Sequence, residues 1–264
     1  MIKLVNLLLE VQGKPKALIL AGAPGAGKGY ILRGLDLGGL KTLNIDDTFI
    51  DLLKQSNVSL DLKSHGPEDR STSAKAMAAA SKKHKNELIP NIVANKESFI
   101  LDGTAASQRN TIKLKSELES AGYDVFMLYV YTDLERSLKQ NQDRFERSGG
   151  EDRSLQPAIV MSTWNSVTKN YEPYQQAFGK NFVSVANTGE AMTDLEQIIT
   201  KYLDPFKPQN TKPKTEKEEI RSRAKKERIN QEIQDLLNSD HLQNIIKYSV
   251  SKDEAQSKIS DFLK

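Results

Sequence analysis

Cysteine is absent from the 264 residues, which excludes disulfide bonds and thiolate metal sites. Long apolar runs are absent too, because no stretch approaches the roughly 20 apolar residues that span a bilayer. Residues 1–10 are apolar, but Lys3, Asn6 and Glu10 interrupt them and no small-residue cleavage site follows. We interpret this segment as a short helix that packs on the domain, not as a signal peptide. These absences favour a cytoplasmic protein without membrane contact.

The chain also has little excess charge of one sign. Its 38 basic and 35 acidic residues leave a net charge of +3, which neither indicates a nucleic-acid partner nor excludes one. With 38% hydrophobic and 28% charged residues, the composition suits one α/β domain and an appendage.

Short apolar runs alternate with helical segments through most of the chain. The runs lie at residues 17–20, 43–45, 98–101, 125–131 and 182–185, and the helical segments at 27–35, 70–94, 107–121, 133–147 and 190–203. This alternation predicts an α/β fold with three layers, in which helices cover a parallel sheet of about five strands. Ligands bind such sheets at the carboxyl ends of the strands.

The composition changes near residue 204. Residues 205–215 are rich in proline and lysine and have little to bury, so they predict a linker. Residues 216–264 then predict a charged helical tail, with a helical pair at 241–263 that has more apolar positions. We therefore expect a P-loop domain over residues 1–204. The late apolar positions favour a tail that docks a protein partner, and its mixed charges favour a solvated face over a nucleic-acid surface.

A glycine-rich loop directly follows the first apolar run. In such a P-loop, backbone N–H groups surround phosphate oxygens at a helix N-terminus, and the lysine neutralises the β- and γ-phosphates. The pattern predicts an ATP site formed by Gly22, Ala23, Pro24, Gly25, Ala26, Gly27, Lys28, Gly29 and Tyr30.

Gly29 and Tyr30 depart from the usual form of this loop. Ser or Thr normally follows the lysine and ligates Mg²⁺ through its hydroxyl. With glycine at that place, we expect Mg²⁺ to be held through waters and carboxylates, which suits an ion that keeps several waters. The missing hydroxyl also favours reduced activity as an alternative.

Acids follow two other apolar runs. Asp46 and Asp47 come after the second run, and we predict that one of them is the general base that activates an acceptor hydroxyl. We expect the second strand to lie beside the strand of the P-loop, so that its end faces the acceptor. The alternative is that one of the pair caps a helix beginning at Thr48 or Phe49. Asp102 follows the third run and is predicted to hold Mg²⁺ through water.

Basic residues suited to a closing lid flank Ser148, Gly149 and Gly150. Arg144 and Arg153 are predicted to stabilise charge on the transferring phosphoryl group, and Arg147 is less favoured. Asn187, after the last strand, is expected to contact the adenine of ATP.

These motifs together resemble a known family. The order Gly-Ala-Pro-Gly-Ala-Gly-Lys, Asp-Asp-Thr-Phe, Ile-Leu-Asp-Gly-Thr and Asp-Arg-Phe-Glu-Arg is similar to that of the zeta-toxin and polynucleotide-kinase-like P-loop kinases over residues 15–203. The zeta-type resemblance implies Asp47 as the base, and the polynucleotide-kinase resemblance implies Asp46. This chain has Asp102 where zeta-type enzymes have Glu, and Ile50 where they have Arg or Lys. The loop around Gly29 also resembles that of adenylate kinases.

The sequence therefore predicts a kinase that moves the γ-phosphate of ATP, with Mg²⁺, to a hydroxyl of a sugar, a nucleotide sugar or a nucleic acid. Two alternatives stay open: a nucleoside monophosphate kinase, and a non-catalytic protein that binds nucleotide for a structural or regulatory purpose. The linker and tail resemble kinases encoded by tailed phages, which implies the cytoplasm of a host as another location.

Overall fold

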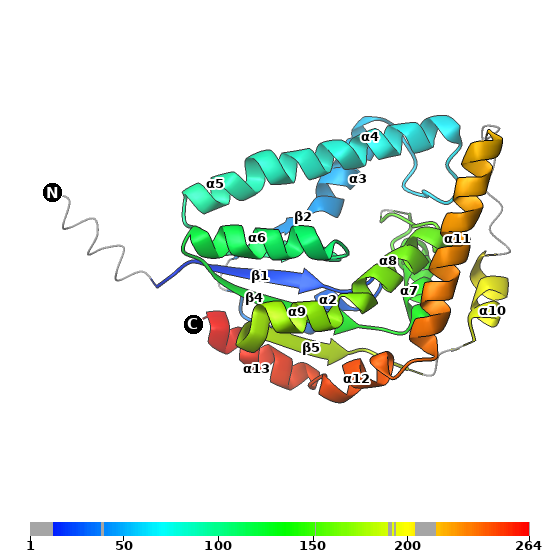
Figure 1. The fold of residues 1–264 in the computed structure, drawn as a ribbon. Coiled ribbons are helices and arrows are strands. Elements are labelled where there is room, and N and C mark those ends of the chain that lie inside the picture. Colours follow the sequence, from blue (N-terminus) through cyan, green and yellow to red (C-terminus); the bar gives the residue numbers. More distant parts are fainter. Residues whose placement is uncertain are drawn as a thin grey trace.

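The computed structural model describes residues 13–37, 40–150, 152–189, 192, 194–203 and 215–263. Its centre is a five-stranded, all-parallel sheet (Figure 1). The strands are β1 (Lys16–Ala21), β2 (Lys41–Asn44), β3 (Phe99–Asp102), β4 (Asp124–Tyr131) and β5 (Phe182–Ala186), in the spatial order β2-β3-β1-β4-β5. The predicted α/β fold is confirmed. The expected neighbour of the P-loop strand is wrong, because β3 lies between β1 and β2.

Helices connect the strands and follow the last one. They are α2 (Lys28–Leu32), α3 (Ile45–Gln55), α4 (Pro67–Lys83), the π-helical turn η1 (His84–Leu88), α5 (Ile89–Ala94), α6 (Gln108–Ser120), α7 (Leu134–Arg147), α8 (Pro157–Lys169), α9 (Tyr171–Phe178), the 3-10 turn η2 (Gly179–Asn181), α10 (Leu195–Ile198), the π-helical turn η3 (Ile199–Leu203), α11 (Glu216–Leu237), α12 (His241–Tyr248) and α13 (Lys252–Leu263). The short helix expected at residues 1–10 lies outside the described residues.

Both faces of the sheet are covered, which explains why its strands are continuously apolar. Successive side chains of β1 point to opposite faces. Ala17 and Ile19 belong to a cluster with residues of α5, α6, α8 and α9, whereas Leu18 and Leu20 belong to a cluster with residues of α2 and α13. In Figure 1, α6 and α9 of the first cluster are drawn in front of the strands, and α13 of the second lies below β5. The fold therefore has the three layers that the alternating pattern predicted.

Helices α8 and α9 were not anticipated from the sequence. Their aromatic side chains are among the most buried of the molecule: Trp164, Tyr171 and Tyr174 are at most 2% exposed. The indole Nε1 of Trp164 donates to the carbonyl of Thr132, at 2.7 Å. This bond joins α8 to the carboxyl end of β4, where the functional loops gather.

A smaller cluster holds α3 against α4. It contains Phe49 and Leu53 of α3, Ala76 and Ala80 of α4, and Leu60 from the loop between them. The cluster is separate from the two on the sheet. It therefore fixes α3, the helix that begins at the predicted acid pair.

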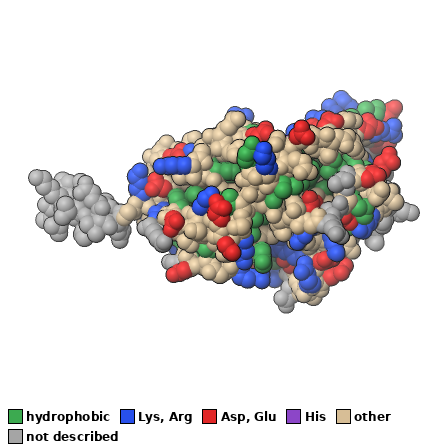
Figure 2. All heavy atoms as spheres, turned by 90° about the horizontal axis from the view of Figure 1, so that it is seen from below, with side chains coloured by type: hydrophobic (Ala, Val, Ile, Leu, Met, Phe, Trp, Pro, Cys, Tyr) green, Lys and Arg blue, Asp and Glu red, His purple; other side chains and the backbone are tan. Residues whose placement is uncertain are grey.

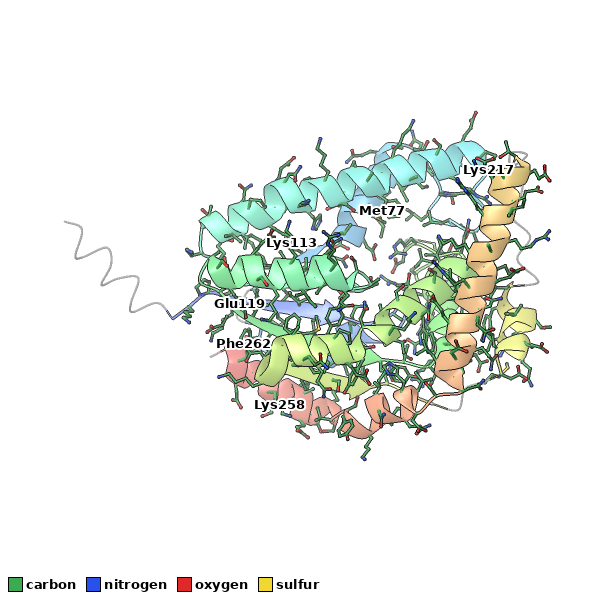
Figure 3. The ribbon with its side chains drawn as sticks, in the orientation of Figure 1. Met77, Lys113, Glu119, Lys217, Lys258 and Phe262 are labelled. Carbon is green, nitrogen blue, oxygen red and sulfur yellow. The ribbon has the colours of Figure 1, made fainter. Side chains whose placement is uncertain are left out.

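The C-terminal helices pack on the body of the molecule. Ile233 of α11 and Ile245 of α12 join the cluster that contains Ile19, and Ala255 and Ile259 of α13 join the cluster that contains Leu20. Between α12 and α13, the backbone N–H of Val250 donates to the carbonyl of Ser184 in β5, at 2.8 Å. Figure 3 labels Lys258 and Phe262 on α13, beneath the sheet.

The division into a domain over residues 1–204, a linker over 205–215 and a tail over 216–264 stays a prediction, as does a protein partner for the tail. The first part of α11, over residues 216–228, is exposed, and Ile220 there is 62% exposed. No helix among the described residues is both long and apolar enough to cross a membrane.

Candidate functional site

The phosphate loop joins the carboxyl end of β1 to the start of α2, as the sequence predicted. The backbone N–H of Gly22 donates to the carbonyl of Thr104 after β3, at 3.1 Å. The Nζ of Lys28 turns back over the loop and donates to the carbonyl of Gly22, also at 3.1 Å. The loop is therefore closed on itself, with its lysine directed along it.

Two glycines of the loop are required by both backbone and packing. Gly25 and Gly27 have φ values of 75° and 91°, which side chains rarely tolerate. A Cβ on Gly25 would lie 3.0 Å from the carbonyl oxygen of Ser137 in α7, and one on Gly27 would lie 2.6 Å from the amide nitrogen of Asn187. The loop thus fits tightly between α7 and the segment after β5.

The same neighbours hold the loop through its carbonyl groups. The hydroxyl of Ser137 donates to the carbonyl of Pro24 at 2.6 Å, and the amide of Asn187 donates to that of Ala26 at 2.9 Å. Asn187 is itself held by β4, because its backbone N–H donates to Tyr131 and its carbonyl accepts from the hydroxyl of Thr132. The predicted adenine contact of Asn187 stays a prediction, and its amide braces the loop.

Asp46 and Asp47 lie in the first turn of α3, directly after β2. The helix begins at Ile45, earlier than expected, and its cap is Asn44, whose side-chain oxygen accepts from the N–H of Asp46 at 2.8 Å. The alternative in which Asp46 or Asp47 caps a later helix is therefore wrong, because the strand-end asparagine already fills that place.

A cluster of charged groups forms where β2, β3 and the phosphate loop end. The amide of Asn44 donates to Asp102 Oδ2 at 3.2 Å, and Arg153 forms an ion pair with Asp46. The Arg153 side chain is largely buried, and its Nε has no hydrogen-bond partner among the described residues. The carboxylates of Asp102 and Asp46 both attract the ammonium of Lys28. The structure thus gathers Lys28, Asp46, Asp102 and Arg153.

Burial shifts the pKa values of these groups. It lowers the pKa of Lys28 and raises that of Asp102, and each partner's charge partly offsets the shift of the other. Burial also raises the pKa of Asp47, and the negative charges of Asp46 and Asp51 add to that effect. The Asp47 carboxylate accepts no hydrogen bond and forms no ion pair with the part of the chain that the structure describes. Asp47 is therefore the acid of the cluster whose carboxylate has no partner among the described residues.

The other predicted arginines separate into two groups. Arg144, in the last turn of α7, pairs with Asp152, and its charge acts on Lys28, Asp47 and Asp102. Arg147 instead donates to the carbonyl of Asp143 one turn earlier in its own helix, at 3.1 Å. Arg144 therefore belongs to the charged cluster, and no contact links Arg147 to it.

Two side chains near the cluster were missed from the sequence. His84, only 2% exposed, lies on the π-helical turn η1, and its Nε2 is hydrogen bonded to the hydroxyl of Thr48 at 3.0 Å. Burial lowers its pKa. Asn44 is the second, and its position at a strand end was the available signal. No local pattern indicated that His84 would reach α3.

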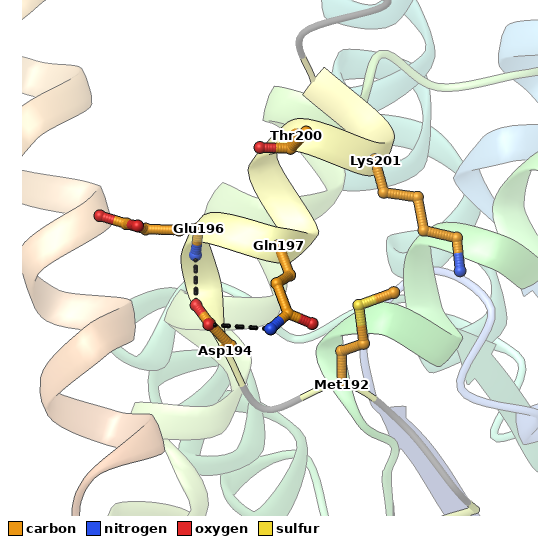
Figure 4. Close-up of a pocket in the computed structure, with 6 residues that line it drawn as sticks. All are labelled: Met192, Asp194, Glu196, Gln197, Thr200 and Lys201. Carbon is orange, nitrogen blue, oxygen red and sulfur yellow. Dashed lines mark hydrogen bonds between the residues drawn. The ribbon is translucent and has the colours of Figure 1, made fainter.

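A shallow hollow lies elsewhere, beside α10. Figure 4 shows Asp194 accepting hydrogen bonds from the backbone N–H of Glu196 and the amide of Gln197, at 2.9 and 3.1 Å. Lys201, on the same rim, is paired with Glu135 at 2.6 Å. Because these polar groups are already paired, the charged cluster at the phosphate loop is the better candidate site.

The zeta toxin family model matches residues 6–197. The chain belongs to the zeta toxin family. The prediction of a P-loop kinase of the zeta-toxin group is thereby confirmed, and membership of this kinase-like family supports ATP-dependent phosphotransfer. No curated protein matches the sequence.

Solved structures of similar fold include a complex of AvrRxo1-ORF1 and AvrRxo1-ORF2, at 17% identity and a TM-score of 0.51, covering 96% of this chain and 82% of that one. A structure of the same pair with ATP has 17% identity, a TM-score of 0.48 and coverages of 96% and 83%. The PezAT toxin–antitoxin system of Streptococcus pneumoniae has 14% identity, a TM-score of 0.47 and coverages of 83% and 87%. At these identities the likeness concerns the fold alone.

Proposed function

We propose that this member of the zeta toxin family transfers the γ-phosphate of ATP to a hydroxyl group of an acceptor, with Asp47 as the general base. The observation that carries this proposal is the contrast within the acid pair. Asp46 is held by Arg153, whereas Asp47 is unpaired among the described residues and has a raised pKa. A general base must be free to accept a proton and basic enough to take it.

The phosphate loop supplies the nucleotide end of this reaction. Its backbone N–H groups and Lys28 bind the β- and γ-phosphates, and the carbonyl braces from Ser137 and Asn187 keep the loop in shape. Asp47 takes the proton of the acceptor hydroxyl while the oxygen of that hydroxyl forms the new bond to the γ-phosphorus. The bond from that phosphorus to the β-phosphate oxygen breaks, and ADP leaves.

The two arginines are suited to the charge that spreads over the transferring phosphoryl group. Arg153 has an Nε without a partner, and Arg144 acts on the same cluster of carboxylates. We propose both as residues of a lid that closes over the phosphates. In this proposal Asp46 positions Arg153.

Asp102 is the proposed ligand of the magnesium shell. Among the described residues, only one of its carboxylate oxygens accepts a hydrogen bond, from the amide of Asn44 at 3.2 Å. No group of three or more acidic or histidine side chains is arranged for a metal within the described ranges. One carboxylate fits Mg²⁺, which keeps several waters and binds mainly to substrate phosphates. Mg²⁺ held there would neutralise charge between the β- and γ-phosphates.

The test is a transfer assay with γ-labelled ATP and four acceptor classes: sugars, nucleotide sugars, nucleoside monophosphates and nucleic acids with a 5′-hydroxyl. We expect label on one hydroxyl-bearing class, and Asp47→Asn to lower the rate about 100-fold or more while ATP still binds. Asp46→Asn is the matched control, and its loss should be smaller.

Three outcomes would contradict the proposal. Equal rates for Asp47→Asn and the wild type would exclude Asp47 as the base. Label on a phosphate of the nucleoside monophosphates alone would indicate a nucleoside monophosphate kinase. ATP binding without transfer to any class would favour a regulatory nucleotide-binding protein.

A further inference from the structure

Tyr30 occupies an unusual place beside the phosphate loop. It lies in the first turn of α2, two residues after Lys28, and its side chain is 54% exposed. The ammonium of Lys252 lies 4.0 Å from the centre of its ring, which is a cation–π contact. Lys252 begins α13, so a residue near the end of the chain reaches the helix that opens at the phosphate loop.

The packing of α13 fixes this approach. The side chain of Gln256 donates to the carbonyls of Ile31 and Arg33 at the end of α2, at 2.7 and 3.1 Å. Ala255 of α13 is fully buried in the same cluster as Ile31. The last turn of α2 is thus bound to α13, while Lys252 lies over its first turn. The position of Lys252 relative to the loop follows from the fold and not from one flexible side chain.

The ammonium of Lys252 is not paired with a carboxylate of the described residues. It forms no ion pair within the residues that the structure describes, and the nearby Glu254 is paired with Lys258 at 2.8 Å. The contact with an exposed ring is weak and easily exchanged for a stronger anion. Figure 2 shows basic, acidic and apolar side chains interspersed over the face below the sheet, so the effect of this cation is local.

We propose that Lys252 binds the phosphate chain of the nucleotide, and that Tyr30 holds its ammonium in place before binding. The proposal rests on the proposed function, in which the loop over residues 22–28 binds ATP. Its consequence is that α13, outside the matched residues 6–197, forms part of the nucleotide site. A cation from α13 also supplies charge near a loop that has Gly29 and Tyr30 in place of hydroxyl-bearing Ser and Thr.

The test is calorimetric titration of the full chain with ATP and, separately, with adenosine. Lys252→Ala should raise the Kd for ATP about tenfold, as expected for loss of one hydrogen bond to a charged group. The Kd for adenosine should not change. Lys252→Arg should keep most of the ATP affinity, and the dependence of ATP binding on salt should be weaker in Lys252→Ala. Lys258→Ala, on the same helix, is the matched control and should bind as the wild type does.

Melting temperatures separate binding from folding. Lys252→Ala should melt within about 2 °C of the wild type, because it removes only an exposed contact. An unchanged ATP Kd in Lys252→Ala, with a wild type that binds ATP, overturns this inference and leaves the proposed function standing. Equal losses in Lys252→Ala and Lys258→Ala, or no rescue by arginine, also overturn it. A wild type that binds no ATP overturns the proposed function and this inference together.

Discussion

On the side of α7 and Asn187, the phosphate loop is held by neutral side chains that donate to its carbonyl oxygens, whereas on the side of α3 it faces charged side chains that hold one another. The hydroxyl of Ser137 and the amide of Asn187 exemplify the first side. The ion pair of Arg153 with Asp46 exemplifies the second. The neutral contacts set the shape of the loop without competing for an anion.

On the charged side, the side chains influence one another electrostatically. The charges of Asp46 and Asp102 act on Lys28, and those of Asp46 and Lys28 act on Asp102, so a change at Asp46 alters the pKa values of both Lys28 and Asp102. The comparison therefore predicts that replacing a charged residue changes chemistry and pH dependence, and that replacing a neutral brace changes stability and affinity.

The largest effect is expected for Lys28→Ala, since Lys28 both contacts the loop backbone and belongs to the charged cluster. Its ammonium donates to the loop at Gly22 and is attracted by Asp102. We expect phosphotransfer to fall about 100- to 1,000-fold, in line with loss of one donor aimed at developing charge. Initial rates with labelled ATP measure this. Lys258→Ala is the surface control. A Lys28→Ala rate within twofold of the wild type would contradict a role of the loop in phosphotransfer.

A pH effect of intermediate size should distinguish Asp46 from Asp47 in α3. Burial and the charges of Asp46 and Asp51 raise the pKa of Asp47, while Arg144 lowers it. A base works only when deprotonated, so the rate falls as the pH drops through its pKa. Asp46→Asn removes one cause of the raised pKa, and we expect its acid limb at lower pH than that of the wild type.

Asp51→Asn is the control for that experiment. It removes a negative charge near Asp47 without breaking the pair between Asp46 and Arg153, so its acid limb should move in the same direction. Profiles of kcat/KM against pH measure both shifts. Acid limbs that stay in place in both variants would contradict Asp47 as the titrating base.

The smallest effect is expected for Asn187→Ala on the neutral side. It removes one hydrogen bond to the loop, at Ala26, and opens space beside Gly27. We expect a loss of about 1 kcal/mol in the free energy of unfolding and an ATP affinity lowered a few-fold, with an unchanged pH profile. Urea unfolding and calorimetry measure the two quantities. A shift of the acid limb in Asn187→Ala would contradict the prediction that the neutral contacts affect stability and affinity but not pH dependence.

Much of the nucleotide side could be predicted from the sequence because its determinants are local. The glycines of the loop follow an apolar strand directly, and glycine readily adopts the positive φ values that Gly25 and Gly27 have in this loop. Asp102 also ends a strand, as expected. The acid pair was found, but its helix began earlier than expected, because Asn44 and not an aspartate caps it.

The amino-acid sequence by itself determined the phosphate loop, the alternation of strands and helices, and the acids at two strand ends. Only the tertiary structure decided that β3 separates β1 from β2, that Arg153 pairs with Asp46 across 107 residues, and that Lys252 reaches Tyr30. The physical reason is that strand order and charge pairing depend on distance in space, which packing of α8, α9 and α13 sets and no local pattern encodes. The conformation of the glycine loop was thus predictable, whereas the partners of the charged groups around it were not.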